Sequence, residues 1–399
     1  MKTAPISLFA QLMSFVSREE FSELESKQSE KKTSNARKYS RWDQFIALIF
    51  CHLAGSDSLR EIEDGLYGAD GKMNHLGACA LKRTTLAYQN KTYDYRLFKD
   101  LYFRLLKKFE SAFGQRLSKR FQAPVYSLDS TTISLCMKLF SWAQYRTRKG
   151  GMKLHTIISN DTLLPVVMDM THAKKADVKM AKSTIEQLPE FSFVVMDRGY
   201  NDYGLFEWMT LRGTHFVTRL KETAKTTLPA KKTRDKGETW GDYEIQFQQD
   251  IAEKGDAALT YRLVQWFDKE HNRWFEFLTN DFELTPNEVS ELYRERWQVE
   301  LFFKKLKQNL KIKSFIGTSE NAVMCQIWTA AICTLLVELI SRRAKFSWSF
   351  SRLMAFLRLN LMTHKDLNEW IDRPALPLRR LKRRGHIPSS DGEQLTLFG

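Results

Sequence analysis

Two aspartates lie where an acidic side chain is unusual. Asp129 interrupts the β-branched run VYSLDSTTISL, and aspartate is depleted in strands because its short side chain competes for backbone hydrogen bonds. Asp197 ends the apolar run FSFVVMD, and the carboxyl end of a buried strand in an α/β sheet is a common place for a ligand. Asp169, in VVMDM, has a similar setting, so the residues alone do not separate it from Asp197. Taken singly, each could equally be an ordinary carboxylate at a loop or sheet edge.

A third acid, Glu300, lies on a predicted helix from about residue 286 to residue 310. Steps of 3, 4 and 7 residues place four side chains on one narrow face of this helix, namely Tyr293, Arg296, Glu300 and Lys307. Lys304 falls on the same face, beside an apolar stripe. A solvated face with i,i+4 ion pairs would give a similar pattern. The excess of cations around a single carboxylate favours a face that attracts phosphate.

Three carboxylates from two strands and a helix suit hard divalent cations. Mg²⁺ prefers oxygen ligands and keeps several waters, so carboxylates and phosphate oxygens are fitting partners. Two such ions about 4 Å apart can activate an attacking oxygen and stabilise a leaving oxygen in an in-line displacement. We therefore expect Asp129, Asp197 and Glu300 to hold two Mg²⁺ (or Mn²⁺) ions.

The charge of the chain indicates a polyanionic partner. Among 399 residues, 62 are Lys or Arg and 47 are Asp or Glu, which gives a formal net charge of +15. Nucleic acid is the first expectation and an anionic membrane the second, although a soluble protein can also be merely basic. The most apolar stretch, 327–340, contains Glu338 and is too short to span a bilayer, so it predicts a buried helix. Five cysteines without a CxxC pair indicate buried thiols in a reducing cytoplasm.

The order of predicted elements defines the fold class. Residues 1–118 have helical periodicity, and two short helices joined by GSDS, followed by the segment 82–85, could form a helix-turn-helix-like DNA reader. From residue 119 to residue 345, three strands, a helix, a strand, a helix and a strand predict a mixed α/β sheet. The stretch at about 221–280 predicts a β-rich insertion, and 346–399 predicts helices followed by a basic tail.

These residues together resemble a known family. The set Asp129, Asp197 and Glu300, with the Y-x2-R-x3-E-x6-K signature that begins at Tyr293, resembles the DDE transposases of bacterial insertion sequences, in particular the insertion sequence four family. L-D-S-T at 128–131 and D-R-G-Y at 197–200 also match its pattern. So do Lys153 and His155, which follow a basic stretch at 145–149, and the resemblance extends over nearly the whole chain.

The resemblance implies an RNase H-like core, with Asp197 rather than Asp169 as the second acid. It also implies that Tyr293, Arg296 and Lys307 contact DNA phosphates near the cut end. The remaining DNA contacts expected on this basis are Lys304, Arg198, Arg146, Lys149, Lys153 and His155. An aromatic side chain in the insertion could stack on an unpaired base, and Trp240, Trp266 and Trp274 are equal candidates, each of which could equally be a core residue.

The expected activity is that of a transposase. Such an enzyme binds the terminal inverted repeats of its element, hydrolyses a phosphodiester bond to free a 3′-OH, and joins that end to target DNA. Paired cuts at two ends favour a homodimer assembled on double-stranded DNA, in the bacterial cytoplasm at the nucleoid and without a membrane role. The alternatives are a metal-dependent nuclease of the same fold that does not join strands, and an inactive DNA-binding regulator derived from a transposase.

Overall fold

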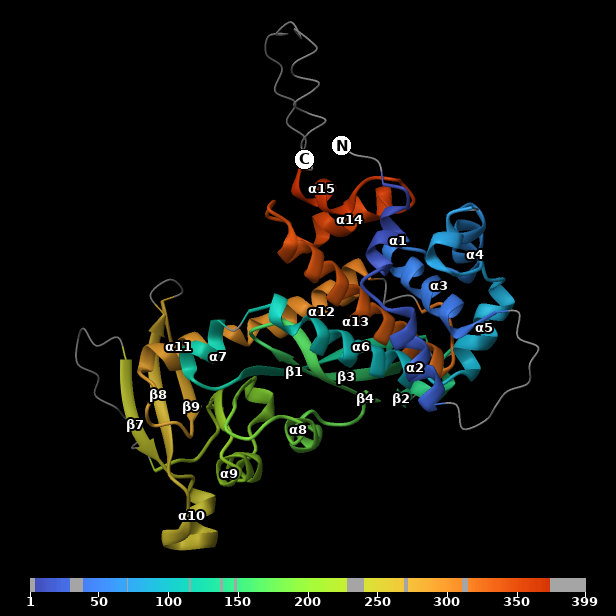
Figure 1. Ribbon diagram of the computed structural model, residues 1–399. Coiled ribbons are helices and arrows are strands. Elements are labelled where there is room, and N and C mark those ends of the chain that lie inside the picture. Colours follow the sequence, from blue (N-terminus) through green and yellow to red (C-terminus); the bar gives the residue numbers. More distant parts are fainter. Residues whose placement is uncertain are drawn as a thin grey trace, which may run out of the picture.

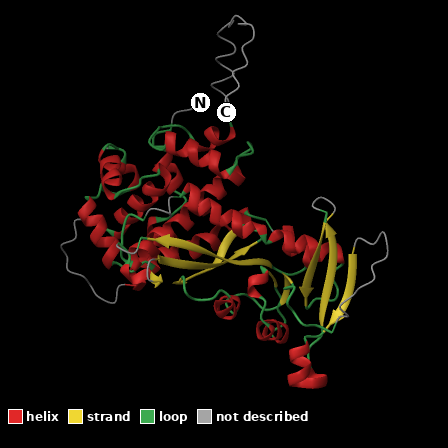
Figure 2. Ribbon diagram, turned by 180° about the vertical axis from the view of Figure 1, so that it is seen from behind, coloured by secondary structure: helices red, strands yellow, loops and turns green. Residues whose placement is uncertain are grey.

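A computed structural model describes residues 4–28, 39–69, 71–114, 116–136, 139–146, 149–227, 240–268, 272–310 and 315–373. A block of helices lies over one end of a long mixed sheet, and the other end of the sheet carries three steep strands (Figures 1 and 2). Segments that are far apart in the sequence therefore meet along the sheet. The predicted mixed α/β class is confirmed.

The sheet has nine strands among the described residues. Its order is β2-β3-β1-β5-β6-β9-β8-β7, and β4 pairs with β3. The central strands β1, β5 and β6 are parallel, and the other pairings are antiparallel. The strand bounds are β1 (Val125–Leu135), β2 (Gln144–Arg146), β3 (Lys149–Ser159), β4 (Leu164–His172), β5 (Phe193–Met196), β6 (His215–Arg219), β7 (Trp240–Ile245), β8 (Tyr261–Asp268) and β9 (Arg273–Thr279).

The expected β-rich insertion is part of this sheet. Its last strand, β9, pairs antiparallel with β6, so β7, β8 and β9 extend the core sheet beyond its parallel centre. A helix that the sequence analysis did not predict, α10 (Gln248–Lys254), connects β7 to β8.

Helices cover both faces of the central strands (Figure 1). The continuous apolar run predicted for β5 is confirmed, because all four of its residues are buried. Alternate side chains point to opposite faces: Val194 joins the apolar cluster of α8 (Val178–Ile185) and α9 (Tyr203–Leu211), whereas Val195 joins that of α7 (Arg116–Phe121) and α11 (Pro286–Glu295). The odd-numbered residues of the first half of β1 face α11 in the same way, as Val125 does.

The terminal helices share one apolar core around α13 (Glu320–Arg343). This cluster also contains residues of α12 (Trp297–Asn309) and one face of β1, β3 and β4. It therefore crosses both boundaries of the predicted division into 1–118, 119–345 and 346–399, which remains a proposal. The other helices of the block are α1 (Leu8–Met13), α2 (Arg18–Gln28), α3 (Arg41–Ala54), α4 (Leu59–Tyr67), α5 (Arg83–Thr92), α6 (Arg96–Phe109), α14 (Phe350–Asn360) and α15 (Leu367–Asp372).

The apolar stretch predicted as a buried helix lies within α13. By length and composition this helix could cross a membrane, but 94% of its most apolar window is buried inside the protein. That burial is typical of the central helix of a folded core. The prediction of a buried helix is confirmed.

Helix ends follow the local sequence signals. Gly55 ends α3 with φ +75°, a conformation that glycine adopts without steric cost. The Ser58 hydroxyl opens α4 by accepting the backbone N–H of Glu61. A short turn of 3₁₀ helix, Met73–Leu76, lies between α4 and α5, so the helices that could form a DNA reader are present and their role stays a prediction.

The cysteines differ in part from expectation. All five are free, which agrees with the prediction of thiols rather than disulfides. Cys51, Cys325 and Cys333 are buried, but Cys79 and Cys136 are exposed. The expectation of five buried thiols was therefore wrong for two of them, because loop packing depends on contacts that sequence spacing does not reveal.

Candidate active site

Strand register brings two of the predicted acids side by side. In the parallel pair β1–β5, Leu128 is the partner of Met196, and each is followed by an aspartate. Neighbouring strands lie about 4.8 Å apart. Asp129, within β1, and Asp197, directly after β5, therefore lie side by side at the same level of the sheet. Each carboxylate accepts the backbone N–H of the next residue at 2.7 Å. Asp169 lies two strands away from β1, on β4.

The signature helix is broken where the sequence predicted one continuous helix. It consists of α11 and α12, which meet at Arg296. Around this junction the hydrogen bonds span three residues instead of four, since Arg296 N donates to the Tyr293 carbonyl and Val299 N to the Arg296 carbonyl. The Glu295 carbonyl instead accepts Ser127 Oγ at 3.1 Å and Asn160 Nδ2 at 3.0 Å. Two side chains of the sheet therefore fix the break above β1 and β3.

Arg296 connects the helix acid to the strand acids. Its Nη1 atom lies 2.7 Å from Glu300 Oε1 and 3.8 Å from Asp129 Oδ2. The two carboxylate oxygens are therefore no farther apart than the sum of these two distances. Glu300 faces the sheet, with a side chain that is 33% exposed, so the structure brings the three acids into one neighbourhood.

The environment of Asp129 disfavours its charged form. Burial raises the pKa of its carboxyl to about 6, and the nearby charges of Asp197 and Glu300 act in the same direction. The Ser130 N–H and the Arg296 guanidinium oppose this rise in pKa. Because carboxylates that repel one another favour a bound cation, this cluster is electrostatically suited to positive charge.

The other signature residues lie around the three acids. The Lys307 amino group contacts the Thr131 hydroxyl and donates to the Thr132 carbonyl at 3.1 Å, which joins α12 to β1. Tyr293 is half-buried against Phe277, with ring centroids 4.9 Å apart. Two predicted DNA contacts, Lys304 and Arg198, are exposed.

A second polar network lies directly beneath Asp129, on the other face of β1. At its centre is Asp177, a residue that the sequence analysis did not single out, at the start of α8. Asp177 accepts the Ser130 hydroxyl at 2.5 Å and Lys153 Nζ at 3.1 Å, and it lies 3.6 Å from His155 Nδ1. The only sequence signal for Asp177 is its place before a predicted helix, because its partners come from other strands.

This network holds two residues that were predicted to contact DNA. Lys153 is 15% exposed and His155 is 1% exposed, and both side chains point to Asp177. Burial lowers the pKa of His155 to about 4, so its ring is neutral at neutral pH. DNA contacts by either residue stay a prediction. Arg146 and Lys149, also predicted DNA contacts, lie outside the residues whose side chains the structure describes.

The tryptophans considered for base stacking differ in exposure. Trp266 and Trp274, in the insertion, are half-buried, and the side chain of Trp240 lies outside those that the structure describes. Trp297, directly after Arg296, is 55% exposed. Trp297 was not among the predicted stacking residues, because such an aromatic was expected only in the insertion.

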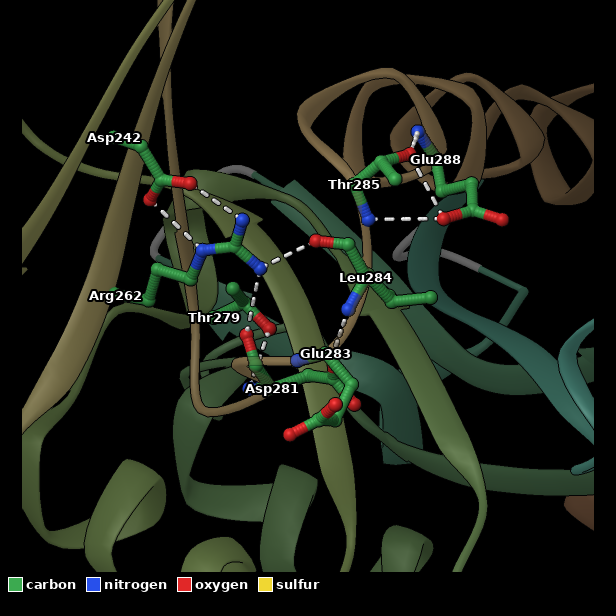
Figure 3. Close-up of polar contacts among 8 residues, drawn as sticks. All are labelled: Asp242, Arg262, Thr279, Asp281, Glu283, Leu284, Thr285 and Glu288. Carbon is green, nitrogen blue, oxygen red and sulfur yellow. Dashed lines mark hydrogen bonds and ion pairs between the residues drawn. The ribbon is translucent and has the colours of Figure 1, made fainter.

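A buried arginine fixes the approach to the signature helix (Figure 3). Arg262 of β8 binds Asp242 of β7 through two hydrogen bonds of 2.8 and 2.5 Å, and it also donates to the carbonyls of Asp281 and Leu284. Asp281 accepts the N–H of Leu284, and the next residue, Thr285, begins α11 with a capping box. The insertion is thereby tied to the start of α11, the helix that leads into α12 and Glu300.

The oxygen atoms of the three carboxylates are of the chemical type that divalent cations bind. Such oxygens are the ligands that Mg²⁺ and Mn²⁺ prefer, and a guanidinium already lies between two of the carboxylates. Within the described ranges, no three or more Asp, Glu, His or Cys side chains are already arranged around one metal position. A metal ion bound to Glu300 Oε1 would compete with Arg296 for that oxygen.

Comparison with known proteins agrees with this geometry. Residues 120–336, more than half of the chain, match the family described as Transposase DDE domain. A DDE domain implies an RNase H-like fold, as expected from the sequence. Residues 5–79 match a family described only as a domain of unknown function.

Three curated relatives are named as transposases. A transposase (y4zB) of Sinorhizobium fredii is 31% identical over 250 residues, which cover 62% of this chain and 69% of that protein. A transposase for insertion sequence element IS5377 of Geobacillus stearothermophilus is 27% identical and covers 66% and 68%, respectively. A transposase for element IS4SA of Synechocystis is 26% identical and covers 64% and 71%.

Proposed function

Because this chain belongs to the DDE transposases, we propose that it moves an insertion sequence by cutting and rejoining DNA. It binds the terminal inverted repeats, hydrolyses phosphodiester bonds to free 3′-OH ends, and joins these ends to target DNA by transesterification. The main support is the register that sets Asp129 beside Asp197, with Glu300 on the helix above them.

We assign the metal ligands to Asp129, Asp197 and Glu300. Two Mg²⁺ or Mn²⁺ ions, when bound, supply activation of the attacking oxygen and stabilisation of the leaving oxygen. The protein contributes a fixed strand pair and a docked helix, which hold the three carboxylates close together. No covalent enzyme intermediate is needed.

Arg296 exchanges partners when DNA enters. In the structure its guanidinium neutralises Glu300 and approaches Asp129. A DNA phosphate offers the same guanidinium a bidentate anionic partner, so binding of the transposon end frees Glu300 for a metal ion.

The remaining cations and aromatics line the path of the DNA. Exposed Lys304 and Arg198 contact phosphates, together with Tyr293 and Lys307. Exposed Trp297 can stack on a base at a distorted DNA end. Arg146, Lys149 and Lys153 are further phosphate contacts in this proposal, and His155, which is 1% exposed, contributes through its position beside Asp177.

The larger assembly follows from the reaction. We assign end recognition to the helices of residues 1–118, catalysis to 119–345 and supporting helices to 346–399. Two ends must be cut in concert, so the active form is a homodimer assembled on DNA. A chromosomal substrate places the enzyme in the bacterial cytoplasm, at the nucleoid.

Cleavage of a DNA duplex that carries the element's own terminal repeat tests the proposal. We expect Mg²⁺-dependent nicking at the repeat boundary by the wild type. Asp129→Asn, Asp197→Asn and Glu300→Gln each remove a negative ligand and should reduce the cleavage rate at least a thousandfold (about 4 kcal/mol), while affinity for the repeat changes less than about threefold.

Three results would contradict this assignment. Substantial cleavage by any of the three variants would remove that acid from the metal ligands. Cleavage without joining of a supplied pre-cut end would indicate a nuclease. Repeat binding that no divalent ion converts into cleavage would indicate a DNA-binding regulator.

A further inference from the structure

A cationic cavity lies beyond the edge of the sheet, where β4 continues into α8. Its volume is about 570 Å³. Three of its residues are lysines, Lys174, Lys175 and Lys179, which we call the lysine cluster. The other lining residues are Met170, Thr171, His172 and Ala176.

The lysine cluster has an excess of positive charge. All three lysines are exposed, and none forms an ion pair with another residue of the described ranges. The nearest acid in sequence, Asp177, already binds Ser130 and Lys153. Uncompensated cations crowded at one place repel one another, so this surface favours a polyanion.

The backbone that carries the lysine cluster is held in place. Ala173 N donates to the Gly151 carbonyl, and Lys175 N donates to the His172 carbonyl at 3.0 Å. The Lys175 carbonyl accepts Lys153 Nζ at 3.2 Å. The lysines are thus presented from a fixed loop, which lowers the entropy cost of binding an anion.

Register places the lysine cluster close to the proposed metal ligands. His172, at the end of β4, pairs with Met152 of β3, which pairs with Ile133 of β1. Two strand spacings, about 10 Å, therefore separate the end of β4 from the second half of β1. Asp177 connects the two places directly, because it accepts the hydroxyl of the residue that follows Asp129.

The lysine cluster and the signature helix are on different sides of the carboxylates. Glu300 and Arg296 approach Asp129 from the face covered by α11 and α12. The loop from β4 leads to α8 on the opposite face of the sheet (Figure 1). A DNA segment bound along α12 therefore leaves the lysine cluster free.

We propose that the lysine cluster binds the phosphate backbone of a second DNA duplex, the target. This inference rests on the proposed function, in which a 3′-OH end held at α12 must meet a phosphodiester of another duplex at the same carboxylates. Contacts between lysines and phosphates are independent of base sequence, which suits a duplex without a fixed recognition sequence. The lysine cluster delivers the target from one side while the transposon end occupies the other.

The test compares the wild type with the triple variant Lys174→Ala/Lys175→Ala/Lys179→Ala. The first measurement is affinity for a duplex without the terminal repeat, over a range of salt concentrations, with a repeat duplex already bound. Loss of three phosphate contacts should lower the slope of log K against log salt by about 3. The second measurement is joining of a pre-cut end to a plasmid, which should fall at least tenfold.

Repeat binding and repeat cleavage by the triple variant should stay within about twofold of the wild type. The matched control is Lys174→Arg/Lys175→Arg/Lys179→Arg, which keeps the charge and should keep target binding. Circular dichroism checks that each variant is folded.

Two outcomes overturn the inference. One is an unchanged salt slope for the second duplex in the alanine variant. The other is a parallel loss of repeat binding, which would assign the lysine cluster to the transposon end. Failure of the proposed function would give a different result, because the wild type itself would not cleave the repeat. The affinity measurement would still decide whether the lysine cluster binds DNA.

Discussion

Arg296 lies between a helix acid and a strand acid, with its Nη1 atom 2.7 Å from Glu300 and 3.8 Å from Asp129. In this position its charge compensates carboxylates that would otherwise repel one another in a partly buried setting. In the proposed function, the same position opposes binding of a metal ion before DNA arrives. The proposal thus makes this single side chain the link between the charge state of the site and the presence of phosphate.

Arg296→Ala should separate metal binding from catalysis. Without the competing guanidinium, DNA-free protein should bind Mn²⁺ about tenfold more tightly, a change of about 1.4 kcal/mol. Cleavage of the repeat should nevertheless become slower, because a phosphate contact is lost. Calorimetric titration with Mn²⁺ and a cleavage time course measure the two effects.

Arg294→Ala is the matched control, since Arg294 is an exposed arginine of α11. It should leave Mn²⁺ affinity unchanged. Equal or weaker Mn²⁺ binding by Arg296→Ala would mean that Arg296 does not compete with metal for these carboxylates.

The element that positions Glu300 is the junction of α11 and α12. Its Glu295 carbonyl, released from the regular helical pattern, accepts hydrogen bonds from Ser127 of β1 and Asn160 at the end of β3. These bonds set the rotation of α12 over the sheet. The consequence is that Glu300 faces Asp129.

Asn160→Ala should therefore impair the site at a distance. The substitution removes two hydrogen bonds, from Asn160 Nδ2 to the Glu295 carbonyl and from Ser127 Oγ to Asn160 Oδ1, and should lower the free energy of unfolding by about 1–3 kcal/mol. Repeat cleavage should slow about tenfold while repeat affinity stays within about twofold, since no DNA contact is removed. Single-turnover cleavage measures the rate, and a binding titration measures the repeat affinity. Exposed Asn74→Ala is the control. An unaltered cleavage rate in Asn160→Ala would show that the docking of Glu295 does not position Glu300.

Sequence patterns predicted the parts of the site that depend on local order. The strands that carry Asp129 and Asp197, and the helical face with Glu300, were all recognisable from periodicity and from the family signature. The break at Arg296 was not, because no proline or glycine marks it and its cause lies in Ser127 and Asn160, far away in sequence. Asp177 was not predicted for the same reason, since its partners Ser130 and Lys153 belong to two other elements.

At the scale of the whole molecule, His52 connects three parts of the helical block. Its Nδ1 donates to the Leu310 carbonyl after α12, and its Nε2 lies 3.0 Å from Thr329 Oγ1 of α13. Complete burial lowers the pKa of His52 to about 4. The imidazole is therefore neutral in the folded protein down to that pH.

This pKa predicts a loss of stability in acid. Below about pH 6.5 the unfolded chain protonates His52 while the folded chain does not, so protons favour unfolding. The free energy of unfolding should fall by about 1.4 kcal/mol per pH unit from about pH 6.5 to about pH 4 on account of His52. His155, whose pKa is also lowered by burial, adds a similar share.

Urea unfolding at a series of pH values checks this expectation. His52→Asn offers an amide donor near the position of Nδ1 and cannot titrate, so its stability should depend less steeply on pH. Exposed His75→Gln should keep the wild-type slope. An identical slope for His52→Asn would contradict the assigned titration.

The shared core around α13 has a consequence for synthesis. Leu8 N, in the first helix, donates to the Thr363 carbonyl, and α3 and α6 pack against α13. A ribosome that has translated the sheet and α12 has therefore released six helices whose main apolar partner does not yet exist. The helical block therefore completes its apolar core only after α13 has been translated.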